Sequence, residues 1–241
     1  MKVFIKKILS ILEIFGLKVV NARVYDLLLL ESAKDPVSYA ELINLKLESV
    51  IHIGGHYGQE RHNYLRNGLS ATFIEGDPEV FAVLVAQLQG TNFGAVNVML
   101  SNKAEERKFY KSSHAGVASS LLEPLRHLEQ YPEVKFHNVS MVSTVTLDSL
   151  NMNGDLIVMD VQGAEHLIIE GGKKTIKGAK ALYLECNVGD LYKGDCSLEQ
   201  LIKLLEADFS LVGVSMNKHF QGDAFFVNRE IIRVSNPDNS I

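Results

Sequence analysis

The segment from Ser49 to Glu75 constrains the fold more than any other part of the chain. It contains a short apolar run, a glycine-rich turn, a polar stretch with helical periodicity and a second apolar run that ends at Glu75. Two strands connected through a helix in this order form a βαβ unit, in which the strands lie parallel. The segment therefore predicts an α/β domain with a ligand pocket at the turn.

The turn itself carries three glycines, Gly54, Gly55 and Gly58. Without Cβ atoms, this backbone can adopt positive φ and approach a ligand closely. We expect a helix that begins near Tyr57 to direct free N–H groups at the ligand. Glu75 lies 21 residues after Gly54, the distance at which an acid can accept hydrogen bonds from both ribose hydroxyls. The pattern indicates a nucleoside-like cofactor.

The glycines do not match the dinucleotide fingerprint G-x-G-x-x-G. Counted from Gly54, that fingerprint requires glycines at the positions that His56 and Gln59 occupy. A dinucleotide-dependent oxidoreductase is therefore disfavoured, although it stays an alternative enzyme class. The helix start Asp77-Pro78-Glu79, directly after the acid, supports a functional pocket over an ordinary tight turn.

From Val50 onward, apolar runs alternate with helical segments, which predicts a doubly wound parallel sheet. Strands are expected at 49–53, 70–75, 94–99, 154–160 and 180–186, and helices at 57–67, 78–89, 164–177 and 197–207. A long excursion from Ser101 to Asp148 should add strands at 106–111 and 139–145. Near the end of the chain, the runs 209–214 and 224–227 have no helix between them and should pair antiparallel.

The run from Asp155 to Gly171, Asp-Leu-Ile-Val-Met-Asp-Val-Gln-Gly-Ala-Glu-His-Leu-Ile-Ile-Glu-Gly, resembles the FkbM-type S-adenosylmethionine-dependent methyltransferases. Further matching segments are Val50–Gly58, Phe73–Pro78, Leu100-Ser101, Val145–Leu150, Leu184-Glu185, Leu191–Gly194 and Gly222–Phe226. The resemblance covers positions 50–228 and implies a class I, Rossmann-like methyltransferase fold. In that fold, seven strands form a mostly parallel sheet whose last strand is antiparallel, with S-adenosylmethionine as the cofactor.

The resemblance also implies the residues that contact the cofactor. In the family, the glycine turn wraps the methionine moiety, the acid at Glu75 holds the ribose, and the pair at Leu100 and Ser101 lies near adenine. The full set implied for this chain is Ile53, Gly54, Gly55, His56, Gly58, Glu75, Gly76, Leu100, Ser101, Asp160 and Val161.

Methyl transfer from a sulfonium is an in-line displacement, so positioning of the reactants, worth about 7–11 kcal/mol, outweighs base assistance of roughly 10² to 10⁴-fold. Asp160 ends a central strand, where open α/β sheets bind ligands, and is the predicted base for a hydroxyl acceptor. It could instead cap the next helix. His114, in the excursion, and His166, which could be structural, are the other catalytic candidates. We expect O-methylation of a sugar, glycan or natural product.

Two residues depart from the family pattern. His52 stands where the family often has an acid, and Gln162 where it usually has Glu. His52 could be a satisfied strand histidine or a cofactor contact. These departures leave a noncatalytic cofactor-binding or scaffold protein as an alternative function.

A metal-assisted O-methyltransferase is a further alternative. Asp160, Glu185 and Asn187 follow two neighbouring expected strands and could bind Mg²⁺ through oxygen ligands.

The histidines follow no zinc-binding spacing. The two cysteines, Cys186 and Cys196, form no disulfide framework, which suits a reducing, cytoplasmic compartment.

Net charge and the N-terminal segment bear on partners. A net charge of −5 disfavours nucleic acid and leaves a small-molecule or glycan acceptor. Residues 1–18 have an amphipathic pattern, which predicts a helix packed on the domain or a second subunit, or weak contact with a membrane surface; an oligomer stays open. We expect an N-terminal helical extension (1–47), a methyltransferase domain (48–230) and a C-terminal tail (231–241).

Overall fold

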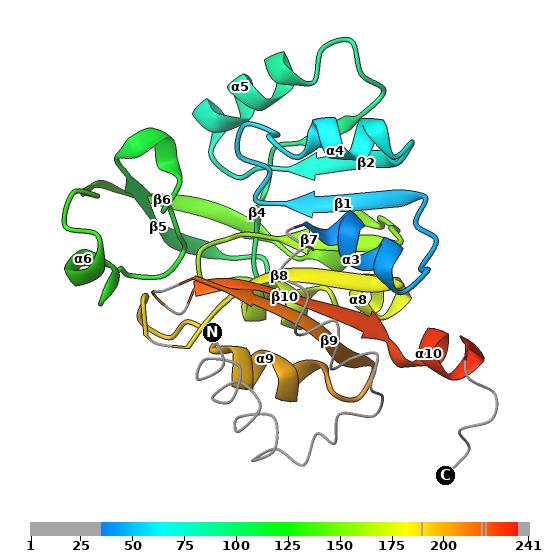
Figure 1. The fold of residues 1–241 in the computed structure, drawn as a ribbon. Helices are drawn as coiled ribbons and strands as arrows, with labels where there is room; N and C mark the ends of the chain where they lie inside the picture. The colour runs from blue at the N-terminus through cyan, green and yellow to red at the C-terminus, as the bar shows by residue number, and fades with distance from the viewer. Residues whose placement is uncertain (1–34, 189, 218, 220, 236–241) are drawn as a thin grey trace.

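A computed structural model describes residues 35–188, 190–217, 219 and 221–235. Its centre is a seven-stranded sheet of order β3-β2-β1-β7-β8-β10-β9 (Figure 1). The strands are β1 (Ser49–Ile53), β2 (Ser70–Ile74), β3 (Gly94–Val96), β7 (Leu156–Met159), β8 (Ala181–Asn187), β9 (Phe209–Met216) and β10 (Gln221–Asn228). β10 is antiparallel to β8 and β9, whereas the pairs from β3 to β8 are parallel. This topology confirms the expected class I arrangement.

The central strands owe their position to continuous apolar sequence. β7 reads Leu-Ile-Val-Met, and all four residues are buried. A parallel strand covered on both faces needs side chains of this kind at every position. On one side β7 pairs with β1 and on the other with β8, so its end lies between those of two parallel neighbours. A ligand site at the strand ends follows from this arrangement.

Helices cover both faces of the sheet. They are α3 (Pro36–Leu42), α4 (Arg61–Arg66), α5 (Pro78–Gln87), α7 (Glu165–Gly171), α8 (Lys173–Gly178), α9 (Leu198–Leu205) and α10 (Arg229–Ser235). Residues of α3, α4 and α5 share one apolar cluster with side chains from the sheet. Residues of α7, α8 and α9 share the other cluster. The sheet is therefore the middle layer of three.

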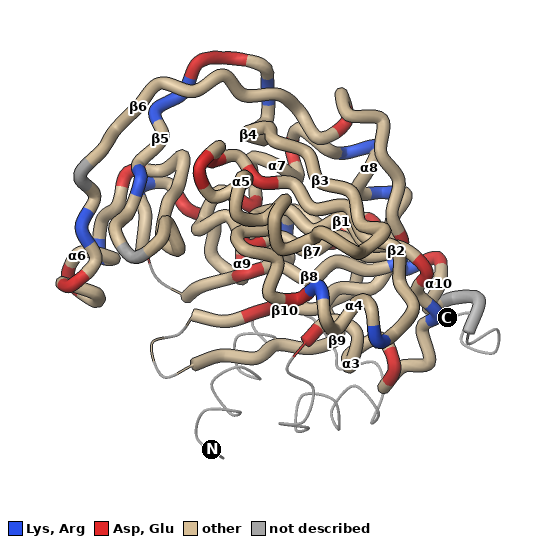
Figure 2. Tube along the Cα trace, turned by 90° about the horizontal axis from the view of Figure 1, so that it is seen from above, with Lys and Arg blue, Asp and Glu red and all other residues tan. Residues whose placement is uncertain are grey.

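The excursion after β3 forms a separate small sheet of order β4-β6-β5. It contains β4 (Met99–Leu100), β5 (Glu106–Ser112), η1 (His114–Gly116), α6 (His127–Gln130), β6 (Phe136–Val145) and η2 (Leu147–Leu150). Figures 1 and 2 both place β5, β6 and α6 to one side of the seven-stranded sheet. The expected strands at 106–111 and 139–145 are thus found, and they pair antiparallel with each other.

Three expected elements differ from the structure. The helix expected at 57–67 begins only at Arg61, because the glycine turn extends to Gly58 with positive φ. The helix expected at 164–177 is divided at Gly172, a position where a Cβ atom would meet the Leu147 side chain. The strand expected at 94–99 is interrupted at Asn97, whose side chain donates to the Glu75 carbonyl, and its end joins β6 instead.

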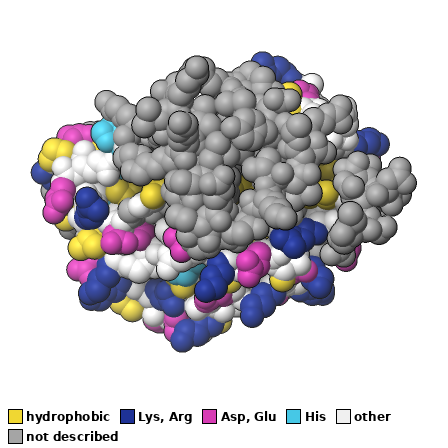
Figure 3. All heavy atoms as spheres, turned by 60° about the horizontal axis from the view of Figure 1, so that its bottom comes forward, with side chains coloured by type: hydrophobic (Ala, Val, Ile, Leu, Met, Phe, Trp, Pro, Cys, Tyr) yellow, Lys and Arg dark blue, Asp and Glu magenta, His cyan; other side chains and the backbone are white. Residues whose placement is uncertain are grey.

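Several expectations concern residues outside the described part of the chain. These are the amphipathic helix of residues 1–18 and most of the C-terminal tail, so the three-part domain division stays a prediction. Within the described residues, no helix is both long enough and apolar enough to span a bilayer. On the face shown in Figure 3, Lys and Arg are interspersed with Asp and Glu.

Helix α3 is attached to the sheet by aromatic packing. Its Asp35 cap accepts hydrogen bonds from Val37 N and Ser38 N, and the ring of Tyr39 stacks on Phe225 of β10 with centroids 5.3 Å apart. Phe225 is fully buried. Tyr39 also contacts Tyr183 of β8 and lies directly over Gly213 of β9, so α3 packs on all three strands.

Replacing Phe225 by Ala should lower the free energy of unfolding by about 3–5 kcal/mol, because it opens a cavity and removes the ring beneath Tyr39. Urea denaturation monitored by circular dichroism would measure the change. Val139→Ala, at an exposed position of β6, is the control and should change stability by less than about 0.5 kcal/mol. Equal effects of the two substitutions would contradict the packing described here.

Candidate active site

A cavity of about 250 Å³ lies at the ends of β1, β2 and β7, where the topology predicts ligand binding. Its lining includes the glycine turn, the end of β2, the β4 segment and the loop after η1. Of the cofactor residues expected from the sequence, the structure places nine in this lining: Ile53, Gly54, Gly55, His56, Glu75, Gly76, Leu100, Asp160 and Val161. Segments far apart in the sequence therefore meet at one site.

The glycine turn is held tightly against the strands. Gly54 has φ of +79°, and its N–H donates to the Ile74 carbonyl at 2.9 Å, as the N–H of Gly55 does at 3.0 Å. A Cβ atom on Gly54 would overlap the carbonyl of Asp160. Gly54 is thus required both by its conformation and by the close approach of β7.

Glu75 connects the turn to β2. One carboxylate oxygen accepts from His56 N at 2.9 Å, and the other accepts from Asp77 N at 2.8 Å. Burial raises the pKa of Glu75, while these two backbone donors act in the opposite direction. Because a carboxylate offers about four acceptor sites, Glu75 retains capacity for hydroxyl groups of a ligand in the cavity.

Gln162 organises the acids after β7. Its Nε2 donates to Asp160 Oδ1 at 2.7 Å and to Glu185 Oε2 at 2.9 Å, and its Oε1 accepts from the Tyr192 hydroxyl at 3.2 Å. Burial and the nearby charge of Asp160 raise the pKa of Glu185 well above its ordinary value. A glutamine here supplies the donor that two neighbouring carboxyl groups need, which gives the departure at 162 a physical reason.

Glu165 fixes the turn that carries Gln162. It is buried at the start of α7, and its Oε1 accepts from Val161 N at 3.0 Å and from Gly163 N at 3.3 Å. Burial raises the pKa of Glu165 to about 8 despite these bonds. The acid therefore has a structural role in the loop that holds Asp160 at the cavity.

Other residues expected at the site lie elsewhere. Ser101 is fully buried, with its N–H bonded to Val145 O, and neither Ser101 nor Gly58 lines the cavity. His166 lies half-buried on α7, also outside the lining. His114 begins η1, but its side chain is outside the described part, so its catalytic role stays a prediction.

Sequence reasoning missed several lining residues, of which Glu60, Met99 and Phe109 are examples. Glu60 ends the glycine turn within the polar stretch expected to be helical, Met99 ends the strand expected at 94–99, and Phe109 belongs to the excursion. An acid two residues after Gly58 was a usable signal, because the end of a glycine turn faces the same ligand as the turn itself. No comparable signal marks Met99 or Phe109, which reach the cavity through the pairing of the small sheet.

The three residues considered for Mg²⁺ do not form a cation site. Asn187 Nδ2 donates to Asp195 Oδ2 at 3.1 Å, and the Gln162 amide lies between the carboxyl groups of Asp160 and Glu185. In the part of the chain that the structure describes, no group of three or more His, Cys, Asp or Glu side chains is arranged to hold a metal ion. The geometry gives Mg²⁺ no support.

Comparison with known proteins yields a family and a relative. Residues 52–211 match the Methyltransferase FkbM domain. The 2-O-methyltransferase NoeI of Sinorhizobium fredii (strain NBRC 101917 / NGR234) is 31% identical over 199 residues, a match that covers 76% of this chain and 80% of NoeI.

Solved structures are similar at a lower level. An S-adenosylmethionine-dependent methyltransferase from Clostridium acetobutylicum ATCC 824 aligns with a TM-score of 0.49 and 9% identity, covering 86% of this chain and 97% of that one. A putative RNA methyltransferase from Pyrococcus horikoshii aligns with a TM-score of 0.44 and 12% identity, covering 80% and 81%. These similarities are too weak to add to what the strand order of the sheet already shows.

Replacing Gln162 by Met should lower the free energy of unfolding by about 1–3 kcal/mol, because Asp160, Glu185 and Tyr192 lose a shared partner while the volume is kept. Chemical denaturation at pH 7 would measure the loss. Gln87→Met is the matched control, since the exposed Gln87 bonds only Arg61 in the described structure. A Gln162 variant as stable as the control would refute the organising role of this amide.

Replacing Glu165 by Gln should flatten the pH dependence of stability. With a folded pKa of about 8 and an ordinary value of 4.5, wild-type Glu165 holds its proton while the unfolded chain releases it. The folded protein therefore loses stability as pH rises from about 4.5 to 8. Gln keeps the acceptor oxygen but does not titrate. Urea unfolding at pH 5, 6, 7 and 8 should show a smaller decline for the variant; parallel curves would contradict the raised pKa.

Proposed function

Because this chain belongs to the FkbM family of S-adenosylmethionine-dependent methyltransferases, we propose that it methylates a hydroxyl oxygen of a sugar, glycan or natural product. The relative NoeI is named a 2-O-methyltransferase, so the acceptor atom in that protein is oxygen. The observation that supports the donor in this chain is the charge of the cavity.

Four carboxylates line the cavity, those of Glu60, Glu75, Asp77 and Asp160. No Lys or Arg is among the described residues of its lining. S-adenosylmethionine carries a sulfonium and an ammonium group, which such a site attracts. A dinucleotide carries a diphosphate, which an acidic lining repels. The charge pattern therefore favours the sulfonium donor over the oxidoreductase alternative.

The lining also suits the parts of the donor. Glu75 retains acceptor capacity for ribose hydroxyls, the glycine turn leaves backbone exposed for the methionine arm, and Leu100 and Met99 offer apolar surface for adenine. When bound, S-adenosylmethionine supplies an electrophilic methyl group on its sulfonium. The protein's main contribution is to hold donor and acceptor in line, worth about 7–11 kcal/mol.

Asp160 is the base that this geometry favours. Asp160 is exposed and lines the cavity. The hydrogen bond from Gln162 Nε2 fixes one of its carboxylate oxygens and leaves further acceptor sites free for a ligand. A carboxylate held this way can accept the proton of a hydroxyl as the oxygen attacks. His166 is less suited, because it lies outside the lining.

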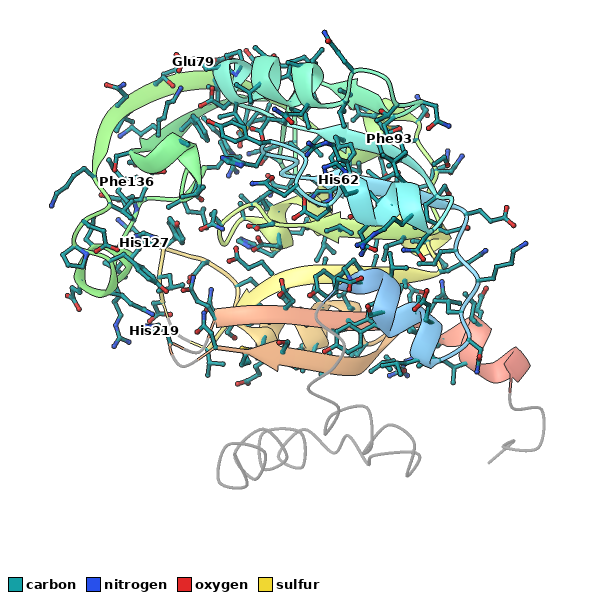
Figure 4. All side chains as sticks on the ribbon, turned by 45° about the horizontal axis from the view of Figure 1, so that its top comes forward. His62, Glu79, Phe93, His127, Phe136 and His219 are labelled. Carbon is teal, nitrogen blue, oxygen red and sulfur yellow. The ribbon has the colours of Figure 1, made fainter. Side chains whose placement is uncertain are left out.

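The acceptor is proposed to enter from the side of the excursion. Val117, Ser119 and Ser120 form that wall of the cavity, and a second cavity of about 140 Å³ is lined in part by residues of the excursion. Arg126, Gln130 and His219 contribute polar groups to the second cavity. His127, Phe136 and His219 lie toward the same end of the molecule in Figure 4. Polar side chains beside aromatic rings suit a polyhydroxyl acceptor.

Asp160→Asn should lower the rate of methyl transfer by roughly 10² to 10⁴-fold while leaving the affinity for S-adenosylhomocysteine within about threefold, because the amide keeps the shape but accepts no proton. Transfer of labelled methyl from S-adenosylmethionine to a panel of saccharides would measure it. Asp208→Asn, at a surface ion pair with Lys177, is the control. An undiminished rate would remove Asp160 from catalysis.

The same material separates the alternative functions. Stabilisation against heat by NAD and not by S-adenosylhomocysteine would replace the proposal with an oxidoreductase. Binding of S-adenosylhomocysteine without transfer to any acceptor would favour a noncatalytic member of the family. Loss of transfer on addition of EDTA would restore the metal-assisted alternative.

A further inference from the structure

Glu60 is a cavity acid that the proposed mechanism leaves unused. We propose that its carboxylate binds the α-ammonium group of the donor's methionine arm. This inference rests on the proposed function and names the part of the donor that Glu60 recognises. It follows from the contacts of the four lining acids, from the geometry around His52 and from the start of α4.

The other three acids of the lining already have strong partners. Glu75 accepts from two backbone N–H groups. Asp77 caps α5 through Glu79 N at 2.9 Å and pairs with Lys111 at 2.9 Å. Asp160 accepts from the Gln162 amide. The Glu60 carboxylate lies 4.0 Å from His52 Nε2, beyond hydrogen-bond distance, and burial raises its pKa while the charges of His56 and Arg61 act in the opposite direction.

The side chain of Glu60 does not cap its own helix either, although its carbonyl accepts from Asn63 N and Tyr64 N. It stands at the N-cap of α4 with φ of −73° and ψ of −13°, and its side chain makes no capping hydrogen bond. A cap residue usually has extended φ and ψ and accepts from the N–H of the second or third helical residue. The side chain of Glu60 instead contributes to the cavity lining. Its position is therefore explained by the cavity and not by the helix.

His52 holds this end of the cavity in place. It is buried on β1, its ring stacks on Phe73 with centroids 5.2 Å apart, and its Nδ1 lies 2.8 Å from the Tyr64 hydroxyl. Burial lowers the pKa of His52 to about 4, so the ring is neutral at pH 7. A neutral ring that accepts the Tyr64 proton at Nδ1 carries its own proton on Nε2, the atom that faces Glu60.

The neutral ring has an electrostatic consequence. A charged histidine would pair with Glu60 and cancel the charge that a cationic ligand needs, whereas the neutral His52 ring leaves that charge in place. Burial and then the charges of Asp160 and Glu60 raise the pKa of Asp223, so these three acids lie near one another at this end of the cavity. The β1 and β7 end of the cavity thus has a negative potential suited to an ammonium group.

The two ends of the cavity differ in what they can bind. Glu75, at the end of β2, is the candidate for ribose, whereas Glu60 and Asp160 lie beside the ends of β1 and β7. The donor's cationic methionine arm extends away from its ribose. With the ribose at Glu75, the arm therefore lies along the glycine turn, and its ammonium group reaches the Glu60 end.

Isothermal calorimetry with two ligands tests the assignment. S-adenosylhomocysteine carries the ammonium group, whereas 5′-methylthioadenosine lacks the whole amino-acid arm. Glu60→Gln should weaken binding of S-adenosylhomocysteine by about 10- to 100-fold, the range expected for a charged hydrogen bond, and leave 5′-methylthioadenosine binding unchanged. Glu60→Asp should recover part of the loss. Glu199→Gln, an exposed acid in the first turn of α9, is the matched control and should bind both ligands as the wild type does.

Each other outcome has a distinct meaning. Equal weakening of both ligands by Glu60→Gln would overturn the inference, because the effect would then be on the shape of the pocket. Tighter binding of S-adenosylhomocysteine would also overturn it, since Glu60 would then face the donor's carboxylate. A wild-type protein that binds neither ligand would refute the proposed function itself, and the inference with it.

Discussion

The site depends on the close approach of β1 and β7. Asp160 N donates to the Ile53 carbonyl at 3.1 Å, and the Asp160 carbonyl lies where a side chain on Gly54 would have to be. This contact places the glycine turn and the proposed base at one point, although more than a hundred residues separate them. Any side chain at position 54 would push the two strands apart. The conformation of the glycine turn and the position of the proposed base therefore depend on the same contact.

Burial of several acids beside this contact has a further consequence. The pKa values of Glu165, Glu185 and Asp223 are all raised, chiefly by burial. With a pKa of about 8, Glu165 keeps its proton at pH 7 and adds no repulsion to the cluster. The Gln162 amide keeps Asp160, an acid of the cavity lining, oriented toward the cavity.

Much of the fold could be predicted because it is encoded in local pattern. Continuous apolar runs such as Leu156–Met159 identify central strands, and a glycine turn followed by an acid at Glu75 identifies the pocket. The sequence could not show that Ser101 is buried behind the cavity, or that Gly172 divides a helix where it packs on Leu147. Those features arise from contacts with distant segments, which periodicity does not record.

The departure at His52 illustrates how a site can keep its charge when a strand residue changes. A histidine buried against Phe73 and bonded to Tyr64 contributes no charge at neutral pH. An acid at the start of the next helix, Glu60, faces the same cavity and has no capping bond to give up. Electrostatic attraction depends on where a charge lies and not on which element carries it. A carboxylate at Glu60, before α4, can therefore supply the negative charge that an acid at position 52 of β1 would otherwise supply. The departure is therefore compatible with a functional donor site.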